Sequence, residues 1–221
     1  MLESPTPDRK ATVLLLLAIA GCVDAIGLAE TGRYFVSFMS GNTTQAGLAL
    51  AYGDWAGTVA PLGLVALFVG GATLGTLVVE RAAKRTVPVL LIVEAALLAL
   101  AWMGFGSSRP MLGVVLLAVA MGLANIVTAQ GPGPHPGVTY ATGALVRVGT
   151  GLAALGRARG GAARLAFDVA SWLALLGGAV GGALARLRYG MSTLAALAAV
   201  VALLGLVELV TAKRRVEGSG R

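Results

Sequence analysis

The stretch Phe35-Val-Ser-Phe-Met-Ser-Gly-Asn-Thr-Thr-Gln-Ala-Gly47 is the most polar run in the first hundred residues, yet apolar segments flank it on both sides. Hydrophobic residues make up 57% of the 221-residue chain, only 12% of residues are charged, and the mean hydropathy is +0.85. This composition leaves too little polar surface to cover a water-soluble globule. The sequence therefore predicts an integral membrane protein in which this polar run has a specific task.

Six apolar runs are long enough to cross a bilayer core, which takes about 20 residues of helix. They cover about 11–29, 57–79, 87–105, 111–128, 164–186 and 191–212. The polar run leads into a shorter apolar segment at about 41–53, and a similar segment covers about 142–156. These two have only 13 and 15 residues, so they are either short spans or half-helices.

The distribution of Lys and Arg favours six spans, because cytoplasmic loops collect positive charge. With six spans and both termini in the cytoplasm, 13 of the 17 basic residues lie inside. The four that lie outside are Arg33, Arg109, Arg186 and Arg188. Counting the short segments as spans would also move Arg81, Lys84 and Arg85 outside. The net charge of +7 thus reflects the membrane topology. A nucleic-acid partner is not expected, because the sequence lacks the basic soluble face with aromatic residues that such a partner would need.

An internal repeat runs through the chain. Gly21-x-x-Asp24 recurs as Gly122-x-x-Asn125, offset by 101 residues, and Ser40-Gly41-Asn42 recurs as Thr142-Gly143-Ala144, offset by 102. Gly70-Gly71-x-x-x-Gly75 recurs as Gly177-Gly178-x-x-x-Gly182, offset by 107. Each unit, about 11–105 and 111–212, holds three spans and one short helix, so the two copies would have opposite orientations. The predicted fold is an all-α polytopic bundle of one domain, 1–221, a 3+3 inverted repeat with polar tails at 1–10 and 213–221.

The start of each short helix is the predicted solute site. Ser40 or Asn42 is a natural N-cap, and Gly41 permits a tight turn into a helix that starts inside the protein. Its free N–H groups must be satisfied by protein, water or solute, and they favour anionic or dipolar ligands. The predicted substrate-binding residues are Asp24, Ser40, Gly41, Asn42, Thr43, Asn125, Thr142 and Gly143. The alternative is a pair of amphipathic helices at the membrane surface with no solute.

Charged residues within spans cost roughly 2.5–3.5 kcal/mol each on insertion scales, so they are usually kept for pairing or function. The candidates for coupling, should protons drive transport, are Asp24, Glu94, Arg147 and Asp168. Asp24 is the strongest; its alternative role is a hydrogen-bonded pin between helices or a partner of Arg147 or Arg33. Asp168 is predicted about one turn into its helix, which indicates a first-turn carboxylate.

Metal, lipid-anchor and enzyme functions find less support. His135 lies in a Pro- and Gly-rich run, 130–137, which predicts a flexible or re-entrant approach to the second short helix. A single histidine without partners predicts no metal site. The segment 19–22 resembles a lipoprotein signal ending at Cys22, but the apolar run continues to Leu28 and favours a span. No nucleophile–base pair is present, so we expect neither an enzyme nor a cofactor.

Gly21-x-x-Asp24-Ala25 and the stretch 35–43 resemble the signature of the YoaK-like family of bacterial membrane proteins of unknown function, with Ser40 where Thr is expected. The resemblance extends over essentially the whole chain and implies six spans without a settled activity. A weaker likeness relates 80–85 to the loop between helices 2 and 3 of major facilitator transporters, although Ala83 replaces the Gly. It implies a half-sized relative that pairs as a dimer.

Together these inferences predict a transporter in the bacterial cytoplasmic (inner) membrane, which moves a small polar or anionic solute by alternating access. Protons are one candidate driving ion. The expected partners are membrane lipid, the solute and a second copy of the chain in a homodimer. A channel-like pore and a non-transporting membrane scaffold are the alternatives.

Overall fold

The computed structural model describes residues 7–82, 86–129, 141–155 and 161–218, and these residues form helices without any strand. The helices are α1 (Pro7–Thr31), α2 (Met39–Ala51), α3 (Trp55–Ala82), α4 (Thr86–Phe105), α5 (Pro110–Ala129), α6 (Ala141–Ala153), α7 (Gly161–Tyr189) and α8 (Ser192–Gly218). Within these ranges, six helices are long and apolar enough to cross a membrane: α1, α3, α4, α5, α7 and α8. The predicted polytopic helical bundle with six spans is confirmed.

The two short helices begin slightly earlier than the sequence predicts. Both α2 and α6 have 13 residues, and they start at Met39 and Ala141. Glycines in the left-handed conformation follow three of the helices, because glycine adopts this conformation without strain. Gly32 (φ 66°) follows α1, Gly53 (φ 70°) follows the C-cap of α2, and Gly190 (φ 61°) follows α7. The helix α8 continues beyond its membrane span to Gly218, so part of the predicted C-terminal tail is helical.

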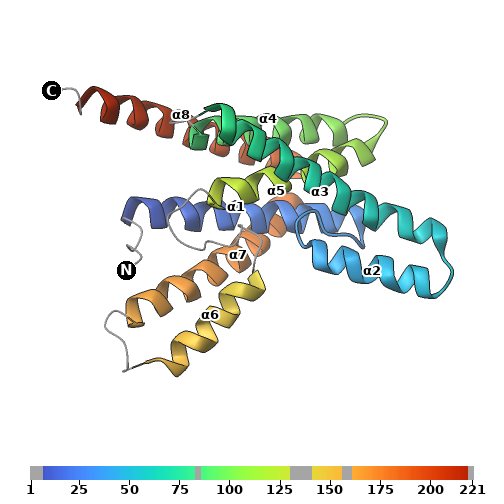
Figure 1. The fold of residues 1–221 in the computed structure, drawn as a ribbon. Coiled ribbons are helices and arrows are strands. Elements are labelled where there is room, and N and C mark those ends of the chain that lie inside the picture. The colour runs from blue at the N-terminus through green and yellow to red at the C-terminus, as the bar shows by residue number, and fades with distance from the viewer. Residues whose placement is uncertain (1–6, 83–85, 130–140, 156–160, 219–221) are drawn as a thin grey trace.

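The long helices pack as pairs that join the first and second halves of the chain. The helix α1 packs along α7, α3 along α5, and α4 lies between α5 and α8. The pairs α1–α7 and α3–α5 run in parallel, while α4 and α8 are antiparallel (Figure 1). Eight alternating crossings would make α4 and α8 parallel. The packing therefore agrees with six crossings in which α2 and α6 do not traverse the bundle.

Close backbone contact in the α1–α7 pair depends on glycine. A Cβ atom on Gly21 would overlap the carbonyl oxygen of Leu175, and a Cβ atom on Gly178 would overlap the carbonyl oxygen of Ala18. Small residues at such crossings let two backbones approach, which is a main source of helix association in membranes.

The α3–α5 pair repeats this arrangement. A Cβ atom on Gly122 would overlap the carbonyl oxygen of Phe68, and one on Gly71 would overlap that of Val119. Gly122 and Val119 lie 101 residues after Gly21 and Ala18 of the first pair. Phe68 and Gly71 lie 107 residues before Leu175 and Gly178 of the first pair. The four glycine contacts thus follow the two offsets of the sequence repeat.

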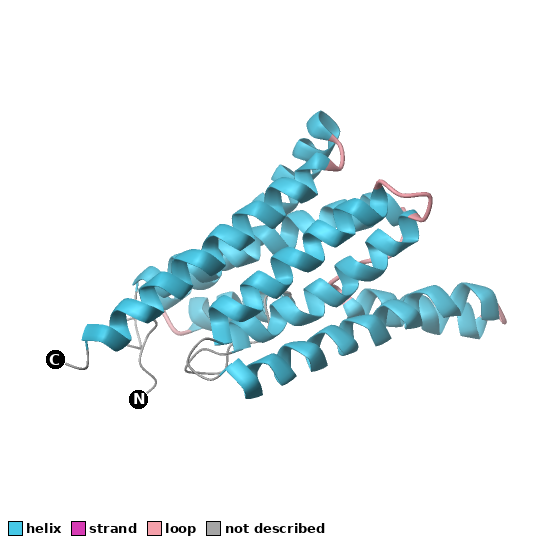
Figure 2. Ribbon diagram, turned by 90° about the horizontal axis from the view of Figure 1, so that it is seen from above, coloured by secondary structure: helices cyan, strands magenta, loops and turns pink. Residues whose placement is uncertain are grey.

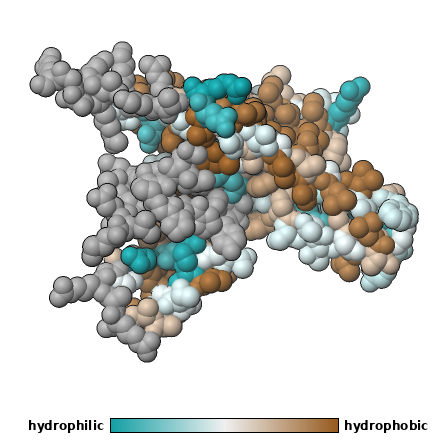
Figure 3. Space-filling model, in the orientation of Figure 1, coloured by the Kyte–Doolittle hydropathy of each residue, from teal (hydrophilic) through white to brown (hydrophobic). Residues whose placement is uncertain are grey.

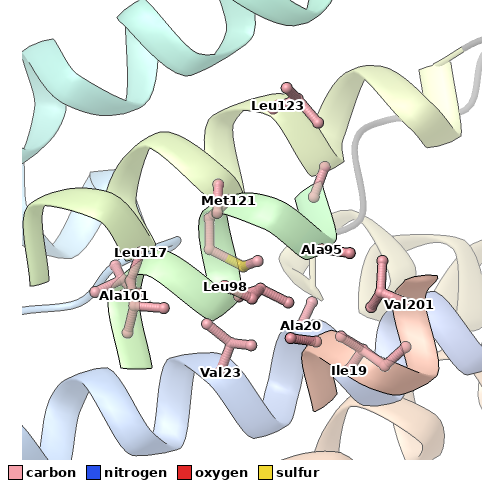
Figure 4. Packing of buried hydrophobic residues seen from close by; sticks show 14 of the residues in the cluster. Ile19, Ala20, Val23, Ala95, Leu98, Ala101, Leu117, Met121, Leu123 and Val201 are labelled. Atoms are coloured by element: carbon pink, nitrogen blue, oxygen red, sulfur yellow. The ribbon is translucent and has the colours of Figure 1, made fainter. Parts of the chain in front are cut away.

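The centre of the bundle is an apolar cluster to which α1, α4, α5 and α8 contribute (Figure 4). Its labelled members are Ile19, Ala20, Val23, Ala95, Leu98, Ala101, Leu117, Met121, Leu123 and Val201. The outer surface is also apolar: large hydrophobic side chains are exposed along α3, α7 and α8. Figure 3 shows this surface as brown patches, and Figure 2 shows that the long helices extend in broadly the same direction. An apolar outer surface is expected where helices face lipid.

Candidate functional site

The chain turns back into the bundle after α1, so that α2 starts well inside it. The segment 32–37 runs along the last two turns of α1: the side chain of Val36 packs on Gly27, and Asp24 Oδ1 accepts hydrogen bonds from the N–H groups of Val36 (3.1 Å) and Ser37 (3.0 Å). Asp24 is seven residues from the end of α1, which corresponds to about 10 Å of helix. The helix α2 then runs outward beside the first half of α3 (Figure 1). This is a re-entrant geometry.

Asn42 holds the same segment from the other side. Its Oδ1 accepts the N–H of Phe35 at 3.0 Å, and its Nδ2 donates to the carbonyl oxygen of Phe35 at 2.7 Å. The side chain of Asn42 is completely buried. The predicted N-cap role of Ser40 or Asn42 is wrong. Phe38 is the N-cap residue of α2, and its apolar side chain makes no capping bond. The amide of Asn42 bonds to the backbone of Phe35 instead.

The other predicted residues of the first half lie along α2. The predicted Gly41 packs against the ring of Phe35, where a Cβ atom would lie 3.0 Å from Cδ2. Ser40 and Thr43 are exposed, and the Thr43 hydroxyl donates to the carbonyl oxygen of Met39 at 2.8 Å. The structure thus brings Asp24, Asn42 and Gly41 together around 35–37 and leaves the two hydroxyl side chains outside this group.

In the second half, an ion pair joins the short helix to the long helix that follows it. Arg147 Nε on α6 lies 2.6 Å from Asp168 Oδ1 on α7, and the Asp168 side chain is 9% exposed. Asp168 is not a first-turn carboxylate as predicted, because α7 begins at Gly161 and places it two turns into the helix. Of the possible partners of Asp24, neither arginine is used: Arg147 binds Asp168, and Arg33 Nε donates to Gln45 Oε1. The role of a pin is the one that the hydrogen bonds of Asp24 support.

The residues predicted to bind solute in the second half are Asn125, Thr142 and Gly143. Asn125 Nδ2 donates to the carbonyl oxygen of Met121 at 2.7 Å, Thr142 is exposed on α6, and Gly143 is buried. The stretch 130–140, which includes His135, lies outside the described residues, as do 83–85 of the loop that resembles major facilitator transporters.

Comparison with known proteins identifies the family of this chain. The family model described as "Protein of unknown function (DUF1275)" matches residues 12–207. The chain belongs to this family. The UPF0700 transmembrane protein RA0705 of Rhizobium meliloti (strain 1021) is 39% identical over 175 residues, which cover 78% of this chain and 74% of the relative. No solved structure matches.

The relative's description as a transmembrane protein agrees with the six-span helical fold, and the DUF1275 description states no function. The matched residues include both α2 and α6. The finer resemblance to YoaK-like proteins and the likeness to major facilitator transporters stay predictions.

Two further polar contacts of this DUF1275 protein were not predicted. Glu30, at the end of α1, forms an ion pair with Arg186, at the end of α7, with 2.8 Å between Arg186 Nε and Glu30 Oε1. The backbone N–H groups of Val36 and Ser37 are the partners of Asp24. The parallel glycine motifs could have indicated the first contact, since they align the C-terminal ends of α1 and α7. Nothing in the residue types indicates the second.

Glu94 differs from the other predicted coupling residues. It lies in the middle of α4, is 1% exposed, and its Oε2 has no hydrogen-bond partner in the described parts of the chain. No three His, Cys, Asp or Glu residues among those described come close enough to hold a metal ion. An unpaired carboxyl oxygen in an apolar core is costly and needs an explanation.

Proposed function

We propose that this protein is a secondary transporter that moves a small polar solute across the bacterial inner membrane by alternating access. The observation that carries the proposal is the start of α2 about 10 Å along α1 from its end, at Asp24. Non-helical backbone at depth is tolerated in membranes where it is buried in protein or lines a path for solute. Broken helices of this kind form the solute sites of transporters that have internal repeats.

The proposal includes the 3+3 inverted repeat, for which the helix packing gives support. The first-half helix α1 packs on the second-half helix α7, and the second-half helix α5 packs on the first-half helix α3. If each helix is replaced by its counterpart in the other half, α1 becomes α5 and α7 becomes α3, so the α1–α7 pair becomes the α5–α3 pair. The glycine contacts of the two pairs correspond in the same way. Under this symmetry, α2 and α6 would approach the interior from opposite sides of the membrane, with both termini in the cytoplasm.

The two halves hold their short helices by different interactions, which suits alternating access. In the first half, Asp24 and Asn42 hold the segment before α2. In the second half, the Arg147–Asp168 ion pair holds α6 against α7. A transporter must open one side while the other stays closed. Two sets of contacts of unlike chemistry could be broken independently by solute binding.

The chemistry at each short helix sets the class of solute. Asp24 already supplies a negative charge at the start of α2, so a polar solute with hydrogen-bond donors suits this side better than an anion. In the second half, Asn125 stands at the position of Asp24, and the side chain of Arg147 is 41% exposed. An anionic solute would therefore depend on Arg147.

A thermal-stability screen of the purified protein against small metabolites tests the proposal. A ligand present at 100 times its Kd would stabilise the fold by about 2.7 kcal/mol. We expect a polar compound that raises the Tm of the wild type but not that of Asp24→Asn, and whose uptake into proteoliposomes saturates. Asp54→Asn is the matched control, since Asp54 is exposed and caps Gly57 at the start of α3. Unsaturable flux would indicate a pore, and no ligand for any compound would indicate a scaffold.

A further inference from the structure

The carboxyl group of Glu94 is surrounded by apolar residues at the centre of the bundle. Its neighbours on the buried face of α4 include Leu90, Leu91 and Leu98. On that face α4 packs against α5 and α8, which contribute Met121 and Val201 to the same core. An ionised carboxylate in such a place needs a cation or several hydrogen-bond donors, whereas a neutral acid does not. The structure describes neither for Glu94 Oε2.

The helices around Glu94 carry few charged residues. The helix α5 contains no Asp, Glu, Lys, Arg or His, and α4 contains no charged residue besides Glu94. On α8, the segment 194–205 that faces α4 is also uncharged, and Glu208 follows it. The helix α3 carries its charges, Glu80 and Arg81, at its end. On α1, Asp24 is occupied by the backbone of 36–37.

The four predicted coupling residues can therefore be separated by their contacts. Asp24 accepts two backbone hydrogen bonds, and Asp168 is paired with Arg147, so three of the four residues already have partners that suit their ionised forms. Glu94 is the member of this set with a buried oxygen that lacks a partner in the described parts of the chain. Only the neutral, protonated form of Glu94 suits the apolar interior of the packed bundle.

We propose that Glu94 is the proton-binding carboxyl that couples movement of the solute to movement of a proton. This inference rests on the proposed transport function. In the packed state, Glu94 holds its proton. When the helices around α4 separate toward one side, water reaches the carboxyl, the O–H bond breaks, and the proton passes to that water. The carboxylate then takes a proton from water on the other side before the core can close again.

Labelling with dicyclohexylcarbodiimide tests the protonation state without any solute. This hydrophobic reagent takes the proton of a neutral carboxylic acid onto its nitrogen while the carboxylate oxygen adds to its central carbon, and the product rearranges to a stable N-acylurea. Mass spectrometry of the purified protein should find the adduct on Glu94, with labelling that falls as the pH rises, and none on Asp24. Labelling of Asp24 in place of Glu94, or no adduct on Glu94 at any pH, would overturn the proposal.

Variants at position 94 test the coupling itself. Glu94→Met replaces the unpaired carboxyl with an apolar side chain of similar length, so we expect a folded protein, and Glu94→Asp keeps the acid. In proteoliposomes with a solute from the thermal screen, an imposed pH gradient should change the initial uptake rate of wild type at least tenfold. The response should be lost in Glu94→Met and partly retained in Glu94→Asp. Wild-type uptake that ignores the gradient would overturn the proton role while leaving transport intact; absence of any transported solute would refute transport, and the labelling would still decide whether Glu94 carries the proton.

Discussion

Gly178→Ala is expected to destabilise the folded protein by about 3 kcal/mol or more, at the upper end of what overpacking costs. The added methyl group would overlap the backbone carbonyl of Ala18, and a backbone atom cannot move aside by changing rotamer. The helices α1 and α7 would have to separate along their whole contact. At the neighbouring Gly177, an added methyl group would have no atom within 4 Å, so Gly177→Ala is the matched control and should leave the Tm unchanged or slightly higher.

The same comparison can be made in the other half of the chain. Gly71 approaches the carbonyl of Val119, while Gly70 has open space. Thermal unfolding in detergent should therefore show a large loss for Gly71→Ala and none for Gly70→Ala. Equal Tm values within either pair would contradict the described helix packing. A loss in only one half would contradict the correspondence between the two pairs.

Asp24→Ala is expected to release the segment before α2. Two backbone N–H groups would lose a charged acceptor inside the protein, which corresponds to a loss of about 3 kcal/mol. Asp24→Asn keeps an oxygen in the same position, so its loss should be smaller. Hydrogen exchange of the Val36 and Ser37 amides measures the effect locally: exchange should be at least tenfold faster in Asp24→Ala than in Asp24→Asn. Equal protection in both variants and the wild type would mean that Asp24 does not hold this segment.

The spans and the closely packed glycines could be recognised in the sequence because each depends on a regular signal. Apolar length identifies a span whatever its neighbours are, and all six were found within a few residues of their ends. The recurrence of Gly21 as Gly122, and of Gly71 as Gly178, pointed to residues that the structure places at the closest helix contacts. Glycine is informative here since close backbone approach permits no larger residue.

The details of the candidate site could not be predicted, because they depend on how the backbone folds between helices. Asn42 has the residue type of a helix cap, but its amide binds Phe35, seven residues earlier. The partner of Asp168 was not predicted either, because the sequence offered Arg147 as a partner of Asp24, whereas the structure pairs Arg147 with Asp168. Residue type limits the bonds that a side chain can form, and only the path of the chain selects among them.

Labelling of single cysteines tests most directly whether the two short helices start in the interior on opposite sides of the membrane. Cys22→Ala provides a background, since Cys22 is the one cysteine of the chain. Ser40→Cys and Thr142→Cys then place a thiol at corresponding, exposed positions of α2 and α6. A membrane-impermeant maleimide should reach Ser40→Cys from the periplasmic side only and Thr142→Cys from the cytoplasmic side only. Labelling of both from the same side, or of neither from any side, would contradict the account.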